Sequence, residues 1–131
     1  MPSILIVEDH KLLGETLARV LRGRGNFEVP FVVETAEDAL ERLPELDVDL
    51  VLVDVSLPHI TGIELVARIH TKYPRLPCLM LSGHTAIQYV SCSLDAGARG
   101  YVLKEDIGGI FEGIQCVLES GTYLSKQLTE K

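Results

Sequence analysis

The chain has 131 residues, a hydrophobic fraction of 47%, a formal net charge of −7 and a sequence pI near 5.0. This length and apolar content fit one packed domain and exclude a disordered chain. Binding to nucleic acid depends on neutralising phosphates, so we expect no direct nucleic-acid binding by this acidic chain.

The cysteines and the first residues of the chain indicate the cellular compartment in which the protein is expected. Cys78, Cys92 and Cys116 are odd in number and lack CxxC or metal-ligand spacing, so we interpret them as free thiols. Residues 1–3 lead directly into an apolar segment without a basic leader, and no apolar run reaches membrane-spanning length. We therefore expect a cytoplasmic protein with no membrane contact.

Short apolar strands alternate with amphipathic helices along the first half of the chain. Thr35, followed by Asp38, is a predicted N-cap, and a glycine-rich stretch at 22–26 ends the helix before it. The predicted elements in chain order are a strand at 4–7, a helix over 13–21, a strand at 28–33, a helix over 35–43 and a strand at 50–54.

The second half continues the same alternation. Gly97 suits a left-handed cap after a short helix that we expect to bury Ile87, Val90 and Leu94. The predicted elements are a helix from 61, a strand at 78–81, a helix over 87–94, a strand at 100–103 and a helix over 107–118. Five strand–helix units with short connections predict an α/β fold, with a parallel sheet between two layers of helices.

Polar residues stand where the predicted strands end. Glu8 and Asp9 follow the first strand, and Asp54 ends the third. Ser82 follows the fourth strand, and Lys104 follows the fifth. Because sites in open parallel sheets form at the carboxyl ends of the strands, this set indicates a site for a divalent cation and a phosphoryl group.

The chemistry of these side chains fits such a site. A carboxylate can attack phosphorus and form an acyl phosphate, so Asp54 is a candidate phospho-acceptor. Glu8, Asp9 and Asp54 are candidate ligands for Mg²⁺, which takes octahedral oxygen ligands and keeps several waters. Lys104 can pair with phosphoryl oxygens as a point charge, and Ser82 offers a hydroxyl to the same group.

Each of these residues, taken alone, also has a structural interpretation. Asp54 suits a turn at a strand end, and the pair Glu8 and Asp9 suits the N-terminus of the next helix. Ser82 suits the turn into its helix, and Lys104 suits a solvated surface charge. The functional interpretation rests on their occurring together in this order.

The chain resembles the receiver domain of two-component response regulators over essentially its whole length. The matching stretches contain the acid pair, an Asp-x-x-x-Pro-x-x-x-Gly pattern, the hydroxyl and the lysine, and lie at 4–10, 54–62, 81–83 and 95–104. The resemblance implies a receiver domain over residues 1–124, with a flavodoxin-like, doubly wound sheet of five strands in the order 2-1-3-4-5 and five helices. Residues 125–131 would be a polar tail or the start of a linker.

The resemblance also implies roles for the site residues. Asp54 would accept a phosphoryl group from a sensor histidine kinase or a histidine phosphotransfer protein. Asp9 would ligate Mg²⁺ directly and Glu8 through water, and the main-chain carbonyl of Ser56 would be a further ligand. Such a domain is a phospho-acceptor with at most intrinsic self-phosphorylation and self-dephosphorylation, and is not an enzyme.

A switch is implied in the same way. Phosphorylated Asp54 would draw the hydroxyl of Ser82 inward, and the ring of Tyr101 would rotate into the vacated space. His84 occupies the position where the family tunes access of the hydrolytic water, while a solvent-facing loop histidine is the structural alternative. The readout surface would be the fourth helix, fifth strand and fifth helix, or the first and fifth helices in a homodimer formed on activation.

The expected output is control of transcription, because the stretch 119–125 is similar to the junction before the helix-turn-helix domain of LuxR-type regulators. A stand-alone or degenerate receiver that acts as a docking module is the alternative. A haloacid-dehalogenase-like phosphatase would need a second Asp where Ser56 stands. A flavodoxin-like cofactor binder would need a phosphate loop where Glu8 and Asp9 stand.

Overall fold

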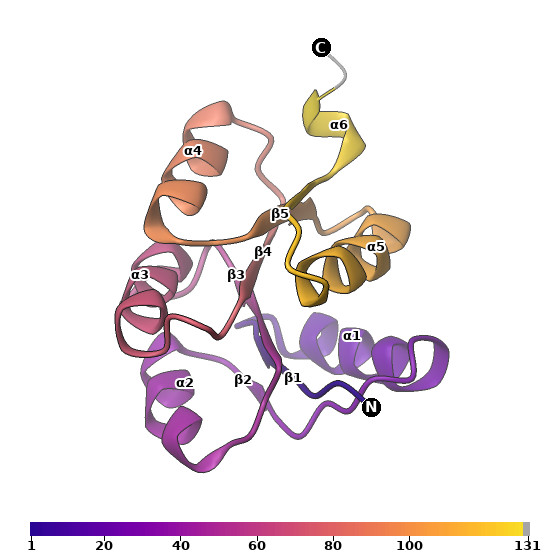
Figure 1. Ribbon diagram of the computed structural model, residues 1–131, viewed down its shortest axis with the longest axis vertical. Coiled ribbons are helices and arrows are strands. Elements are labelled where there is room, and N and C mark those ends of the chain that lie inside the picture. Colours follow the sequence, from indigo (N-terminus) through magenta and orange to yellow (C-terminus); the bar gives the residue numbers. More distant parts are fainter. Residues whose placement is uncertain (130–131) are drawn as a thin grey trace.

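A parallel sheet lies at the centre of the molecule, as the computed structural model, which describes residues 1–129, shows in Figure 1. Its strands are β1 (Ile4–Val7), β2 (Val32–Val33), β3 (Leu50–Asp54), β4 (Cys78–Ser82), β5 (Gly100–Leu103) and β6 (Tyr123–Leu124). Their spatial order is β2-β1-β3-β4-β5-β6, and every neighbouring pair is parallel. The predicted α/β, flavodoxin-like architecture is confirmed, and the first five strands have the predicted order.

Helices cover both faces of the sheet. They are α1 (Lys11–Arg24), α2 (Ala36–Arg42), α3 (Gly62–Lys72), α4 (Ile87–Ala96), α5 (Ile107–Leu118) and α6 (Lys126–Thr129), with a 3₁₀ turn η1 (Leu43–Glu45). Figure 1 shows α1 and α5 on one face and α2, α3 and α4 on the other. At the end of α4, Gly97 has φ +117°, the left-handed cap that the sequence predicts. Within residues 1–129, none of the helices is long and apolar enough to span a bilayer.

The strands supply buried side chains to two separate cores. Along β1, Leu5 and Val7 lie in the core under α2, α3 and α4, whereas Ile4 and Ile6 lie in the core under α1 and α5. Successive side chains of a strand point to opposite faces, so a strand covered on both faces needs apolar residues throughout. All four residues of β1 are fully buried, and each such side chain contributes roughly 1.5–3 kcal/mol to folding.

The N-caps of the helices show that the acid pair Glu8 and Asp9 does not cap helix α1. Thr35 and Thr61 are N-caps, and each accepts the N–H of the residue three positions on, at 3.0 and 3.2 Å. At α1, the N-cap is His10, whose Nδ1 accepts a backbone N–H at 3.1 Å. Glu8 and Asp9 are therefore not the capping residues of this helix, and their carboxylates lie outside its first turn.

Helix α4 buries fewer apolar side chains than its hydrophobic pattern predicts. Val90 is buried, but Ile87 and Leu94 are 70% and 38% exposed. A second buried position belongs to Ser93, whose hydroxyl donates to the carbonyl of Tyr89 one turn earlier at 2.6 Å. A serine that satisfies its hydrogen bond inside its own helix can face the core without an apolar side chain.

The prediction of five strands and five helices is wrong at the carboxyl end. Tyr123 and Leu124 form β6 in register with Gly100 and Tyr101 of β5, and α6 follows. Two residues are too few to show a periodicity, and strand pairing uses main-chain groups that almost any residue carries. Residues 125–129 of the expected polar tail therefore take part in the fold, while 130 and 131 lie outside the described residues.

Strand β2 is shorter than the predicted range of 28–33. It comprises residues 32–33, and only an isolated bridge between Ser3 and Glu28 precedes it. Pro30 lies between these two pairings and has no N–H to donate to a ladder. The proline therefore interrupts the strand.

The three cysteines are free, as predicted. Cys78 is buried at the start of β4, where burial raises the pKa of its thiol to about 12. Cys92 is exposed on α4, and Cys116 on α5 donates to the carbonyl of Thr122 at 3.3 Å. At so high a pKa, the Cys78 thiol has almost no thiolate at neutral pH and is unreactive.

Candidate phosphoryl and metal site

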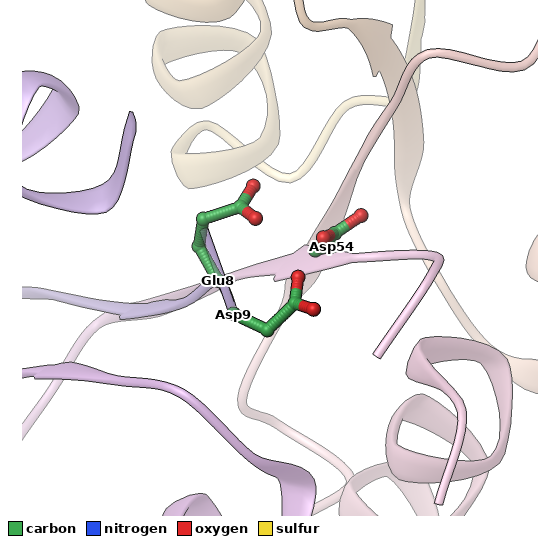
Figure 2. A group of neighbouring side chains, drawn as sticks. All are labelled: Glu8, Asp9 and Asp54. Carbon is green, nitrogen blue, oxygen red and sulfur yellow. The ribbon is translucent and has the colours of Figure 1, made fainter. Parts of the chain in front are cut away.

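Three carboxylates meet at the carboxyl edge of the sheet. Asp54 is the last residue of β3, and Glu8 and Asp9 follow the adjacent strand β1. Because neighbouring parallel strands end at the same edge, one oxygen of each acid lies within 4.8 Å of the others. Figure 2 shows the three carboxylates around the ends of these strands. Glu8 and Asp54 are buried, whereas Asp9 is exposed.

Lys104 reaches the carboxylates from the turn after β5. Its Nζ lies 3.2 Å from Oδ2 of Asp54 and 3.1 Å from Oε1 of Glu8. Its backbone N–H donates to the carbonyl of Ser82 at 2.9 Å, which holds the start of the turn against β4. Burial lowers the pKa of the Lys104 ammonium, but the two neighbouring carboxylates outweigh burial and raise it. The lysine is therefore a fixed positive charge inside the acidic cluster.

Glu8 is the most deeply buried of the three acids. Its side chain has no solvent exposure, and among residues 1–129 its Oε1 is the buried side-chain oxygen without a hydrogen-bond partner. The approach of Lys104 to this oxygen is a charge contact without hydrogen-bond geometry. Burial and the nearby Asp54 raise the pKa of Glu8 to about 7, although the His10 N–H, which donates to Oε2 of Glu8 at 3.0 Å, and Lys104 oppose the rise. A buried carboxylate beside two other acids fits the donor set of a hard divalent cation.

Backbone groups of the β3–α3 loop orient Asp54. The N–H of Ser56 donates to Oδ1 of Asp54 at 3.0 Å, and Oδ2 faces Lys104. Helix α3 begins so close to the strand that a Cβ at Gly62 would overlap the carbonyl oxygen of Asp54. The glycine of the Asp-x-x-x-Pro-x-x-x-Gly pattern is therefore required by the approach of two backbones. His59, between these residues, has φ +63°, which few non-glycine residues adopt.

His84 connects the two residues of the predicted switch. Its N–H donates to Oγ of Ser82 at 2.8 Å, and its carbonyl accepts from the hydroxyl of Tyr101 at 3.0 Å. The ring of Tyr101 is fully buried, and burial raises the pKa of its hydroxyl. The imidazole of His84 stacks on Tyr89 with ring centroids 4.5 Å apart, and its Nε2 lies 3.1 Å from Oγ of Ser56.

The structure thus brings the predicted site residues to one end of the molecule in two groups. The three acids lie within 4.8 Å of one another and Lys104 contacts Glu8 and Asp54, whereas Ser82 and Tyr101 are joined through the backbone of His84. The sequence did not predict the role of Tyr89, because no pattern marks it as the stacking partner of His84. For His84, the only signal was its place two residues after Ser82.

Comparisons with known sequences agree on one family. A sequence model of the family described as response regulator receiver domain matches residues 4–114. The transcriptional regulatory protein DegU of Brevibacillus brevis is 34% identical over 128 residues, which make up 97% of this chain and 54% of that protein. The transcriptional activator protein ExaE of Pseudomonas putida is 34% identical over 128 residues, 96% of this chain and 59% of that protein. The chain therefore spans a little over half the length of these relatives.

Solved structures give the same answer for the fold. A LuxR-family two-component response regulator from Aurantimonas sp. SI85-9A1 has a TM-score of 0.93 at 26% identity, and the match covers 98% of this chain and 92% of that one. A CheY-like receiver domain protein from Methanospirillum hungatei JF-1 has a TM-score of 0.80 at 27% identity, with 92% and 95% coverage. The sequence match over residues 4–114 includes every predicted site residue from Glu8 to Lys104. The chain belongs to the response regulator receiver domain family.

Proposed function

We propose that this chain is the phospho-accepting receiver of a two-component system, and that Asp54 takes a phosphoryl group from a phosphorylated histidine. The donor would be a sensor histidine kinase or a histidine phosphotransfer protein. A carboxylate oxygen of Asp54 attacks phosphorus, the P–N bond of the donor breaks, and its electron pair stays on the imidazole, which takes up a proton. The observation that carries the proposal is the cluster of Asp54 with Glu8 and Asp9 within 4.8 Å, and with Lys104 at 3.2 Å.

The acids fit Mg²⁺ as the resident ion of this site. Asp9 and Asp54 would hold it directly and Glu8 through water, and the main-chain carbonyl of Ser56 is a further proposed ligand. When bound, the ion offsets the negative charge on the phosphoryl oxygens. The features of this chain that support a cation are the three clustered acids and the buried Oε1 of Glu8, which has an ion pair with Lys104 but no hydrogen bond.

Lys104 and Ser56 prepare Asp54 for attack. The Ser56 N–H holds one carboxylate oxygen, so the carboxylate meets the donor in a fixed orientation. Lys104 pairs with Asp54 before the reaction and would pair with the phosphoryl oxygens afterwards, as a charge on a flexible stem. Asp54 is 1% exposed, so the reacting carboxylate has little contact with bulk water.

We infer that Ser82 and Tyr101 change conformation in response to phosphorylation of Asp54. The Ser82 hydroxyl accepts from the His84 N–H, and would turn to donate to a phosphoryl oxygen. Tyr101 is already buried and bonded to the His84 carbonyl, so phosphorylation would raise the population of this arrangement rather than create it. The surface that changes would be formed by α4, β5 and α5.

Control of transcription is the proposed output. Both relatives named above are transcriptional regulators by name, and this chain spans a little over half their length. With a net charge of −7, the chain would not bind DNA itself, and a homodimer formed on activation would pass the signal on. A cytoplasmic location follows from a histidine kinase as donor. In this role the chain is a phospho-acceptor rather than an enzyme with its own substrate.

The test is intact mass after incubation with acetyl phosphate, with and without Mg²⁺. We expect a Mg²⁺-dependent gain of one phosphoryl group that is absent in Asp54→Asn. Lys104→Ala should still gain the group, but its amide hydrogen exchange should change less on phosphorylation. If a folded protein that binds Mg²⁺ gains nothing from acetyl phosphate or from a phosphorylated histidine kinase, the chain is a docking module instead.

A further inference from the structure

Ser125 bonds to both ends of the turn that presents Lys104. It lies between β6 and α6, and its side chain is fully buried. Its Oγ accepts the N–H of Leu103 at 3.0 Å and donates to Oδ2 of Asp106 at 2.9 Å. Leu103 directly precedes Lys104, and Asp106 comes two residues after it. One hydroxyl from the carboxy-terminal segment therefore joins the residues on either side of the lysine.

Asp106 extends this connection to α5. Its Oδ1 accepts the N–H of Gly109 at 3.0 Å and caps the helix, while its own N–H donates to the carbonyl of Leu103 at 3.0 Å. A Cβ at Gly109 would overlap the Asp106 carboxylate, so the glycine leaves room for this cap.

We propose that Ser125 is a positioning residue for Lys104, and that its hydroxyl fixes the β5–α5 turn so that the ammonium lies against the Asp54 carboxylate. The inference deepens the proposed function, because it concerns the lysine that would bind the phosphoryl group. Without the hydroxyl, the buried Leu103 N–H and one Asp106 oxygen lose their partner, and the turn must shift to find others. A displacement of about 1 Å at a reacting group is enough to slow a reaction substantially.

The main chain of Ser125 also connects the carboxy-terminal segment to the site. The N–H of Ser125 donates to the carbonyl of Tyr101 at 3.1 Å, and its carbonyl accepts from Leu128 in α6 at 2.9 Å. A shift of the Lys104 turn on phosphoryl binding therefore reaches the first turn of α6. Because coupling is reciprocal, a change at α6 would also alter the affinity of the site for the phosphoryl group.

The experiment measures the initial rate of phosphoryl uptake from acetyl phosphate at saturating Mg²⁺. Ser93→Ala is the matched control, because Ser93 is also fully buried and its hydroxyl bonds to a backbone carbonyl, but it lies on α4. We expect Ser125→Ala to lower the rate about tenfold and Ser93→Ala to leave it unchanged. Ser125→Cys should fall between wild type and Ser125→Ala, because a thiol is a weak hydrogen-bonding group. If Ser125→Ala does not fold, Ser125→Cys takes its place in the comparison.

Measurements of stability and of Mg²⁺ affinity distinguish a positioning role of Ser125 from a purely structural role. The hydrogen bonds of Ser125 go to the turn and not to the three acids, so its variants should bind Mg²⁺ within about twofold of wild type. Equal rate losses in Ser125→Ala and Ser93→Ala, at equal urea midpoints, would overturn the inference. If the wild type takes up no phosphoryl group, the proposed function fails. The ¹³C shift of the Lys104 ε-methylene then decides: it should change in Ser125→Ala and not in Ser93→Ala, and an unchanged shift would refute the positioning role.

Discussion

Glu8→Gln is predicted to stabilise the metal-free protein above neutral pH. Burial and Asp54 raise the pKa of Glu8 from 4.5 to about 7. The folded state therefore binds this proton more tightly than the unfolded state does. The resulting stabilisation is complete below about pH 4.5 and is lost as the pH rises through about 7. Glutamine keeps the shape of the side chain and removes the buried charge that the wild type must carry at higher pH.

The size of the effect follows from the shift in pKa. One pKa unit corresponds to about 1.36 kcal/mol, so the interval from 4.5 to about 7 sets an upper value of about 3 kcal/mol. The glutamine amide must still fit beside the Lys104 ammonium, which lowers the gain. We therefore expect the free energy of unfolding to rise by about 1–3 kcal/mol near pH 8 and by less than about 1 kcal/mol near pH 5.

Urea unfolding of both proteins in excess chelator at these two pH values measures the difference. Asp9→Asn is the control, because Asp9 is exposed in the same cluster and its neutralisation should change stability by less than about 0.5 kcal/mol. Mg²⁺ at ten times its dissociation constant should stabilise the wild type by about 1.4 kcal/mol and Glu8→Gln by less. If Glu8→Gln is less stable than wild type by the same amount at both pH values, the ionised carboxylate is stabilising and the reasoning is wrong.

Three further predictions concern the loops and the buried tyrosine. His59→Gly should raise stability by about 0.5–1 kcal/mol by relieving the backbone at φ +63°, and an unchanged urea midpoint would show that the loop is not strained there. Gly62→Ala should cost more than about 2 kcal/mol because its Cβ overlaps the Asp54 carbonyl, whereas Gly108→Ala on α5, where the added Cβ meets nothing, should be neutral or stabilising. Tyr101→Phe should lose about 1 kcal/mol with the hydrogen bond to His84, and equal stability in urea would argue that this bond contributes nothing.

The convergence of the acids could be predicted from the sequence because each signal is local. Asp54 ends an apolar run, Glu8 and Asp9 end another, and parallel topology follows from the alternation of strands with helices. Once the strands are parallel, their carboxyl ends lie at one edge, so the one-dimensional order places these side chains together. Lys104 is placed by the same argument, since it follows β5 by one residue.

The features that escaped prediction depend on contacts between distant segments. β6 is held to β5 by main-chain hydrogen bonds and has no pattern of its own. From the sequence, Ser125 is predicted to be part of a polar tail. Its burial is explained by its hydrogen bonds to Leu103 and Asp106. On α4, the apolar spacing favoured a core position for Ile87, but Ser93 takes part of the inner face. A hydropathy pattern does not record that a serine can satisfy its hydroxyl within its helix.

Three departures from ordinary local structure lie at the carboxyl edge of the sheet, where the candidate site is, although the left-handed residues Asn26 and Ser120 lie elsewhere, after the ends of α1 and α5. The edge holds a buried Glu8 oxygen without a hydrogen bond, a left-handed backbone at His59 and the close approach at Gly62. Each lowers stability or restricts the sequence, whereas the two cores under the helices follow the simple rule of apolar residues on both faces. Conflicts of this kind concentrate where function requires them. Fold alone would be served better by an apolar residue at position 8, and the buried carboxylate there supports the cation site proposed above.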